Sequence, residues 1–122
     1  MPPPEVMVVE DDAILRECVA DTLSMSGFRP VVASNGREAL LLLRGEARPP
    51  RAILLDMVMP EMNGWQLRAE LLTSPELCEI PVIIMSGAED ADEVPGHAFI
   101  RKPFGCEQLL RTVARVTRLR LT

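Results

Sequence analysis

The chain has 122 residues, of which 48% are hydrophobic and 25% are charged, and this size and balance indicate one soluble globular domain with a real core. A net charge of −5 argues against direct nucleic-acid binding, and no apolar run approaches the ~20 residues that a membrane helix needs. The chain starts without a signal-peptide pattern, and its three cysteines are odd in number and form no CxxC pair, which favours free thiols in the cytoplasm. We expect residues 1–4 to be a disordered tail and residues 5–122 to form the domain.

Five short apolar runs alternate with helical patterns along the chain. The predicted strands are residues 6–9, 30–33, 52–55, 82–85 and 98–100. Pro30 cannot donate to a strand ladder, so the second of these runs belongs nearer an edge of the sheet. The run at 52–55 is apolar throughout, which is typical of a central strand that is covered on both faces. Strands and helices in this order predict an α/β fold with a parallel sheet and helices on both faces.

The helices are predicted from apolar periodicity and from their end signals. The first follows Asp12, which we expect to cap it, and ends at Gly27. Its predicted apolar face consists of Ile14, Leu15, Cys18, Val19, Thr22 and Leu23. Further helices are predicted at 36–43, at 65–72 and after Pro103. The four leucines at 40–43 exceed one buried stripe, so they either pack tightly, which we expect, or leave an exposed interface. Trp65 and the methionines are interpreted as packing residues.

Polar side chains follow four of the predicted strands, at the point where each strand ends. The acids 10–12 follow the first strand, Asp56 the third, Ser86 the fourth and Lys102 the fifth. Ligands of open parallel sheets bind beyond the carboxyl ends of the strands, so these side chains should converge on one edge.

The chemistry of this set indicates a phosphoryl site. Two carboxylates about 4 Å apart repel by roughly 4 kcal/mol at an effective dielectric near 20, so a cluster of acids requires protons or a cation. Oxygen ligands suit Mg²⁺, whereas the only histidine, His97, has no partner ligands for zinc. Lys102 is the only lysine beside twelve arginines, which suggests a specific role for a compact, mobile charge. With the hydroxyl of Ser86, this set can bind a phosphoryl group in transfer.

Four motifs in this order and spacing carry a family resemblance: VMVVEDD, LLDMVMPEMNGW, PVIIMSG and FIRKPF. With them the chain resembles the receiver domains of two-component response regulators over nearly its whole length. The resemblance implies a flavodoxin-like, doubly wound five-stranded parallel sheet of strand order 2-1-3-4-5. It also implies a signalling domain rather than an enzyme, one that assists its own phosphorylation and dephosphorylation.

The resemblance assigns roles to individual residues. Asp56 would accept a phosphoryl group from the phosphohistidine of a histidine kinase or phosphotransfer protein. Asp11 would bind Mg²⁺ (or Mn²⁺) directly and Glu10 through water, with Asp56 and the backbone carbonyl of Val58 as further ligands. The downstream protein target is not indicated by the sequence.

Three further residues complete the implied site. Ser86 stands at the position of the family's switch hydroxyl, and Lys102 at that of its lysine. Phe99 is either the switch aromatic, which turns inward when Ser86 moves toward the phosphoryl group, or an ordinary core residue of the last strand.

One segment departs from the family pattern. Residues 87–98 are few for a parallel crossover, and Pro95-Gly96 interrupts them, so the fourth helix should be shortened or missing and the output face unusual.

Two other functions are disfavoured by the sequence. A haloacid-dehalogenase-like phosphatase would require a second acid at the position of Val58, and a flavin carrier would require a phosphate-binding loop at the position of the acids 10–12. The serious alternative is a receiver-like interaction module that is never phosphorylated.

Overall fold

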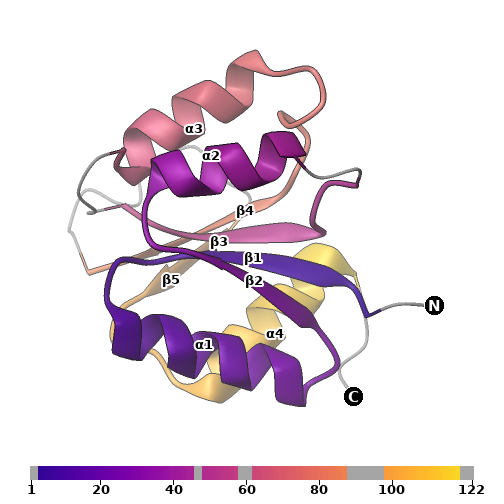
Figure 1. Cartoon of the computed structure of the whole chain (residues 1–122). Helices are drawn as coiled ribbons and strands as arrows, with labels where there is room; N and C mark the ends of the chain where they lie inside the picture. The colour runs from indigo at the N-terminus through magenta and orange to yellow at the C-terminus, as the bar shows by residue number, and fades with distance from the viewer. Residues whose placement is uncertain (1–2, 46–47, 58–61, 88–97, 119–122) are drawn as a thin grey trace.

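The computed structural model describes residues 3–45, 48–57, 62–87 and 98–118. These contain five strands and four helices (Figure 1). The strands are β1 (Glu5–Val9), β2 (Arg29–Ala33), β3 (Ala52–Asp56), β4 (Val82–Ser86) and β5 (Ala98–Arg101). The helices are α1 (Ala13–Met25), α2 (Gly36–Gly45), α3 (Gly64–Thr73) and α4 (Cys106–Thr117).

All neighbouring strands pair in parallel, in the order β2-β1-β3-β4-β5, which confirms the predicted flavodoxin-like sheet. β3 lies in the centre, and β2, the strand that contains Pro30, lies at an edge as expected. Helices α2 and α3 cover one face of the sheet, and α1 and α4 cover the other (Figure 1). The expected shortening of a fourth helix concerns residues 88–97, which lie outside the described residues.

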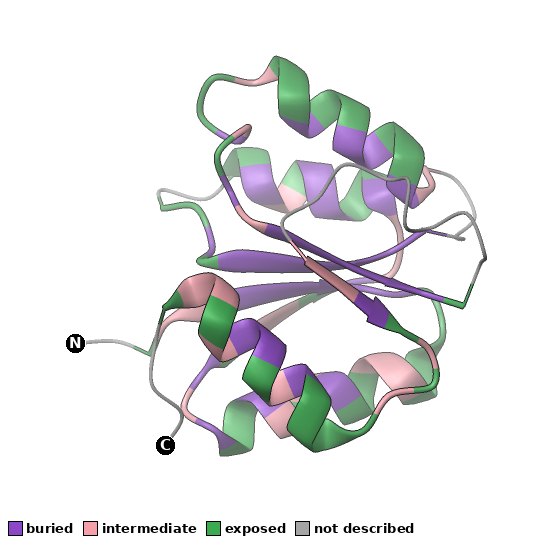
Figure 2. Cartoon of the chain, turned by 180° about the vertical axis from the view of Figure 1, so that it is seen from behind, coloured by how far each residue is buried: buried purple, intermediate pink, exposed green. Residues whose placement is uncertain are grey.

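The alternation of side chains along each strand separates the core into two halves. Met7, Ile53 and Ile84 belong to the half beneath α2 and α3. Their chain neighbours Val8 and Leu54 belong to the half beneath α1 and α4. Because the central strands are covered on both faces, β1, β3 and β4 are almost wholly buried (Figure 2), which is why their sequences are continuously apolar.

The predicted helix ends are found in the structure. The Asp12 carboxylate accepts hydrogen bonds from the backbone N–H groups of Ile14 and Leu15, at 3.0 and 3.2 Å, and so caps α1. Gly27 follows α1 with a φ of 92°, a left-handed conformation that glycine adopts without strain. At α3, Asn63 and Gln66 form a reciprocal capping box.

Four predicted packing residues are exposed instead. Met25, at the end of α1, is 83% exposed because it lies about 120° around the helix from the buried Val19. Ile14 is 77% exposed because it lies about 140° around α1 from the buried Val19. Leu41 is 68% exposed because four consecutive helical residues span about 300°, so α2 buries the first and last leucines of the run and not this one. Trp65 is 44% exposed because it lies about 120° from the buried Leu71 on α3.

Candidate functional site

Three acids meet at the carboxyl ends of β1 and β3. Glu10 follows β1, Asp11 is the next residue, and Asp56 is the last residue of the neighbouring β3. One carboxylate oxygen from each lies within 4.8 Å of the others. Glu10 and Asp56 are buried and Asp11 is exposed, so protein covers the cluster on one side and water reaches it on the other. Such a set of oxygen atoms suits a hard cation that retains part of its hydration shell.

Lys102 brings a positive charge to the same cluster from the end of β5. Its backbone N–H donates to the carbonyl of Ser86 at 3.1 Å, which fixes the chain beside β4. Its Nζ atom lies 2.7 Å from Oε1 of Glu10 and 3.4 Å from Oδ1 of Asp56. The contact with Glu10 is a charge-assisted hydrogen bond, whereas the longer approach to Asp56 is mainly Coulombic.

The electrostatics of the cluster are those of crowded, poorly hydrated charges. The pKa of Glu10 is raised to about 7, mainly by burial and also by nearby Asp56, while the hydrogen bond from Lys102 opposes both effects. For Lys102, burial alone would lower the pKa, but contact with Glu10 and Asp56 outweighs burial, and its pKa is raised. The ammonium therefore stays charged, and Glu10 is the group of this pair that exchanges a proton near neutral pH.

Glu10 is held in place through its backbone as well as its side chain. Its N–H donates to the carbonyl of Ala33 at 3.0 Å, which extends the ladder between β1 and β2. Its own carbonyl accepts a hydrogen bond from Nη1 of Arg16 at 2.8 Å. The N–H of Asp12 donates to Oε2 of Glu10 at 3.3 Å, so Asp12 joins the cap of α1 to the acid cluster.

The start of α3 presses against the end of β3. The N–H of Gly64 donates to the carbonyl of Met57 at 3.2 Å. A Cβ atom on Gly64 would lie 2.7 Å from both the carbonyl oxygen of Asp56 and Cα of Met57. Only glycine allows this approach, so Gly64 positions the backbone that carries Asp56.

Ser86 and Phe99 lie on neighbouring strands. Ser86 ends β4 and is 2% exposed. Phe99 lies on β5, half-buried, and packs against the core beneath α2 and α3. The structure thus brings Glu10, Asp11, Asp56 and Lys102 together at one edge, with Ser86 in backbone contact with Lys102. Val58, the remaining expected ligand, lies outside the described residues.

Comparison with known proteins places this geometry in a family. The sequence model for the response regulator receiver domain matches residues 6–114. The chain belongs to this family. It is 39% identical over 120 residues to the two-component response regulator ORR11 of Oryza sativa subsp. indica, covering 93% of this chain and 81% of that protein. It spans only about half the length of other curated relatives that it matches.

Solved structures of receiver domains have the same fold. The receiver domain of a signal transduction histidine kinase from Syntrophus aciditrophicus is 31% identical, with a TM-score of 0.86, and 94% of this chain and 90% of that chain are covered. The receiver domain of sensor histidine kinase PA1611 from Pseudomonas aeruginosa was solved with a magnesium ion coordinated in its active site cleft. It is 20% identical, with a TM-score of 0.87 over 95% of this chain and 98% of that one, so this likeness concerns the fold. Within the described residues, no helix has the length and apolar character of a membrane span.

Sequence reasoning missed three residues around the site. Arg16 lies on the polar face of the helical pattern, and nothing in its spacing indicates a bond to the carbonyl of Glu10. Gly64 belongs to the LLDMVMPEMNGW motif, but its contact with Asp56 depends on how α3 approaches the sheet, which the sequence does not indicate. Arg101 was passed over beside Lys102, although it stacks on Phe99, with Cζ 5.6 Å from the ring centroid.

Proposed function

We propose that this receiver domain accepts a phosphoryl group on Asp56, in an Mg²⁺-dependent transfer from the phosphohistidine of a histidine kinase or phosphotransfer protein. The observation that supports this most directly is the acid cluster itself. Oxygen atoms of Glu10, Asp11 and Asp56 lie within 4.8 Å of one another, and Nζ of Lys102 lies 3.4 Å from Asp56. Receiver domains interact with kinases and phosphotransfer proteins of this kind.

The donor set fits a divalent cation. Glu10, Asp11 and Asp56 would hold Mg²⁺ or Mn²⁺, with the carbonyl of Val58 as the proposed fourth protein ligand. When bound, the ion offsets the negative charge on the oxygens of the transferred phosphoryl group. Three carboxylates meet at this edge, and a dication would offset the repulsion between them.

The residues of the chain divide the transfer between them. An oxygen of Asp56 attacks phosphorus in line, and the bond from phosphorus to the donor nitrogen breaks, with its electron pair returning to the imidazole ring. Lys102 lies close enough to Asp56 to pair with a phosphoryl oxygen, and the hydroxyl of Ser86 can donate to another. A depression of about 400 Å³ lies next to Lys102 and gives the phosphoryl donor room to approach. It is lined by Leu15, Lys102, Pro103 and Phe104.

The signal follows from the new charge. A phosphoryl group on Asp56 adds about −1.5 to −2 charges, which attract Ser86 and Lys102. We infer that Phe99 then turns toward the space beside Ser86 and that this biases a pre-existing equilibrium of the surrounding surface. The output is a protein-interaction surface in the cytoplasm, and this domain itself does not contact nucleic acid.

Beryllofluoride, which mimics a phosphoryl group on aspartate, provides the test. Trp65 lies in the first turn of α3, next to Gly64, which contacts the backbone of Asp56. Its fluorescence should change when beryllofluoride and Mg²⁺ are added to the parent. The change should be absent in Asp56→Asn and present in Asp21→Asn, a matched change at an exposed acid of α1. No response in the folded parent, together with no incorporation of phosphoryl groups from acetyl phosphate, would favour the alternative of an unphosphorylated interaction module.

A further inference from the structure

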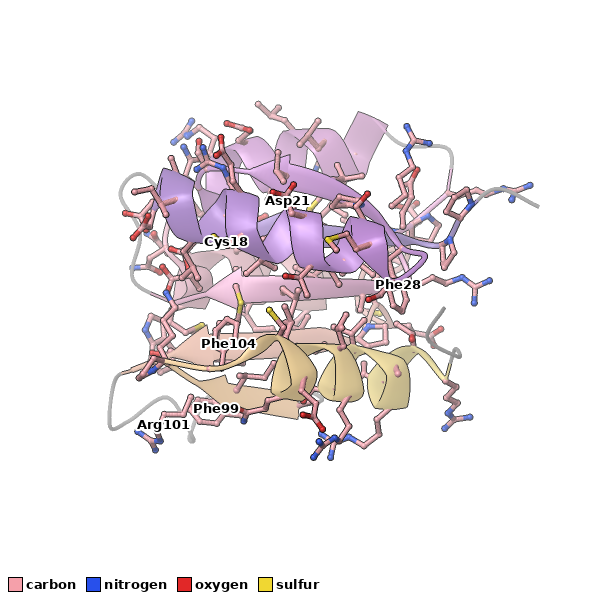
Figure 3. All side chains as sticks on the ribbon, turned by 90° about the horizontal axis from the view of Figure 1, so that it is seen from below. Cys18, Asp21, Phe28, Phe99, Arg101 and Phe104 are labelled. Atoms are coloured by element: carbon pink, nitrogen blue, oxygen red, sulfur yellow. The ribbon has the colours of Figure 1, made fainter. Side chains whose placement is uncertain are left out.

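Arg101 covers the ring of Phe99 on β5. Phe99 packs against the core beneath α2 and α3, and residues two apart on a strand face the same side, so Arg101 projects from that face too. Its guanidinium carbon lies 5.6 Å from the ring centroid, within the range of a cation–π contact. Figure 3 shows the two side chains next to each other beside β5. The ring is therefore held between the core on one side and a guanidinium group on the other.

Arg101 also lies opposite the residue that we propose as the switch. In the register of β4 and β5, Ser86 pairs with Arg101 and Ile84 pairs with Phe99. Ile84 belongs to the core beneath α2 and α3, so Ser86, two residues later, projects toward the same face. The hydroxyl, the aromatic ring and the guanidinium thus share one face of two neighbouring strands, and Lys102 is the next residue in the chain.

We propose that Arg101 is a positioning residue that holds Phe99 in its half-buried arrangement, which we call outward, and so sets the threshold of the switch. An arginine is charged at every physiological pH, and Arg101 is exposed. It cannot follow the ring into the core without losing its hydration, so an inward turn of Phe99 breaks the cation–π contact. A contact of this kind at an exposed site favours the outward ring by roughly two- to fivefold. The inference rests on the proposed function in one respect, because phosphorylation of Asp56 is the event that turns the ring inward. The position of the Phe99 ring in the unmodified protein does not depend on that function.

Fluorine NMR can measure the position of the ring directly. The chain has only three phenylalanines, Phe28, Phe99 and Phe104, so 4-fluorophenylalanine labelling yields three resonances that single Phe→Leu changes assign. Phe28 and Phe104 belong to or pack against the core beneath α1 and α4, on the other face of the sheet. Their resonances therefore report whether a variant keeps the fold.

Arg101→Ala should shift the Phe99 equilibrium toward the inward ring by roughly two- to fivefold in the metal-free protein. The beryllofluoride concentration at half-response, with Mg²⁺ present, should fall by the same factor, because the two equilibria are linked. Arg101→Lys, which keeps a cation over the ring, should restore part of the outward population. Arg111→Ala is the matched control, since Arg111 is an exposed arginine of α4 that pairs with Glu107, and it should leave Phe99 unchanged.

Two results would overturn the role of Arg101. One is an unchanged Phe99 resonance in Arg101→Ala while Phe28 and Phe104 show a native fold. The other is an equal shift in Arg101→Ala and Arg101→Lys, which would mean that the cation does not position the ring. If the parent protein does not respond to beryllofluoride, the proposed function is contradicted instead. The inward and outward populations of Phe99 in metal-free protein would still test the role of Arg101.

Discussion

Replacing Lys102 by Met tests whether one ammonium group holds the acid cluster together. Nζ of Lys102 lies 2.7 Å from Glu10 and 3.4 Å from Asp56, and the two acidic side chains are only 1% and 7% exposed. Methionine keeps the length and the apolar stem of the side chain but removes its charge. The variant would remove from the two buried carboxylates the ammonium that pairs with both of them.

The size of the loss can be worked from these distances. At an effective dielectric near 20, the two attractions amount to roughly 6 and 5 kcal/mol, and desolvation of the three groups offsets much of this. Removing one partner of a buried ion pair costs roughly 3–5 kcal/mol when the remaining charge cannot be neutralised. Glu10 can be neutralised by a proton, so the loss should depend on pH.

The direction of this dependence follows from the pKa of Glu10. Burial is the main cause that raises it from 4.5 to about 7, so in the parent this group contributes stability below pH 4.5 that is lost as the pH rises through 7. Without Lys102 the pKa of Glu10 should rise further, and the loss of stability should continue above pH 7. We expect the free energy of unfolding of Lys102→Met to lie only slightly below that of the parent at pH 5. At pH 8.5 it should lie roughly 3–5 kcal/mol below that of the parent.

Urea unfolding of metal-free protein at both pH values measures this difference. Arg111→Met is the control, because its ion pair with Glu107 is exposed and should be worth about 1 kcal/mol or less at either pH. Mg²⁺ should bind the Lys102→Met variant more tightly than the parent, since a dication can replace the missing charge. An equal deficit at pH 5 and pH 8.5, or weaker Mg²⁺ binding by the variant, would refute the reasoning.

Three further predictions concern the same edge of the sheet. Mg²⁺ affinity should rise between pH 6 and pH 8, because a proton on Glu10 competes with the metal; calorimetric titration that finds equal affinities would contradict this. Asp12→Ala should lower the free energy of unfolding by ~1 kcal/mol through loss of the α1 cap but leave Mg²⁺ affinity unchanged, and a tenfold weaker affinity would instead make Asp12 a ligand. Gly64→Ala should cost roughly 1–3 kcal/mol in urea unfolding, because its Cβ would meet the backbone of Asp56, whereas Gly45→Ala has open space and should be neutral or slightly stabilising; equal effects would show that this contact is soft.

The sequence was sufficient to predict the sheet and the meeting of the acids. Continuous apolar runs such as Ala52–Leu55 mark strands that are buried on both faces, and parallel strands bring their carboxyl ends to one edge. Glu10 and Asp56 are therefore neighbours by topology alone. The same topology brings Lys102 to this edge, but no periodicity indicates which acid a flexible side chain 92 residues away will reach.

Helix surfaces were harder to predict, because periodicity locates a stripe but not its width. Ile14, Leu41 and Trp65 are apolar residues that lie off the buried stripe and are exposed. Arg68 shows the reverse: it lies beside Leu67 and Leu71 on α3 and is buried, and burial lowers its pKa. Whether a side chain at the margin of a helix face is covered depends on the neighbouring elements, which local sequence does not specify.

The most direct test of the central proposal is the mass of the chain after incubation with acetyl phosphate. The proposal predicts that the parent gains one phosphoryl group, that the gain requires Mg²⁺, and that borohydride reduction and peptide mapping locate it at Asp56. A phosphoryl group that persists in Asp56→Asn, that maps to another residue, or that forms equally well with excess chelator would contradict it.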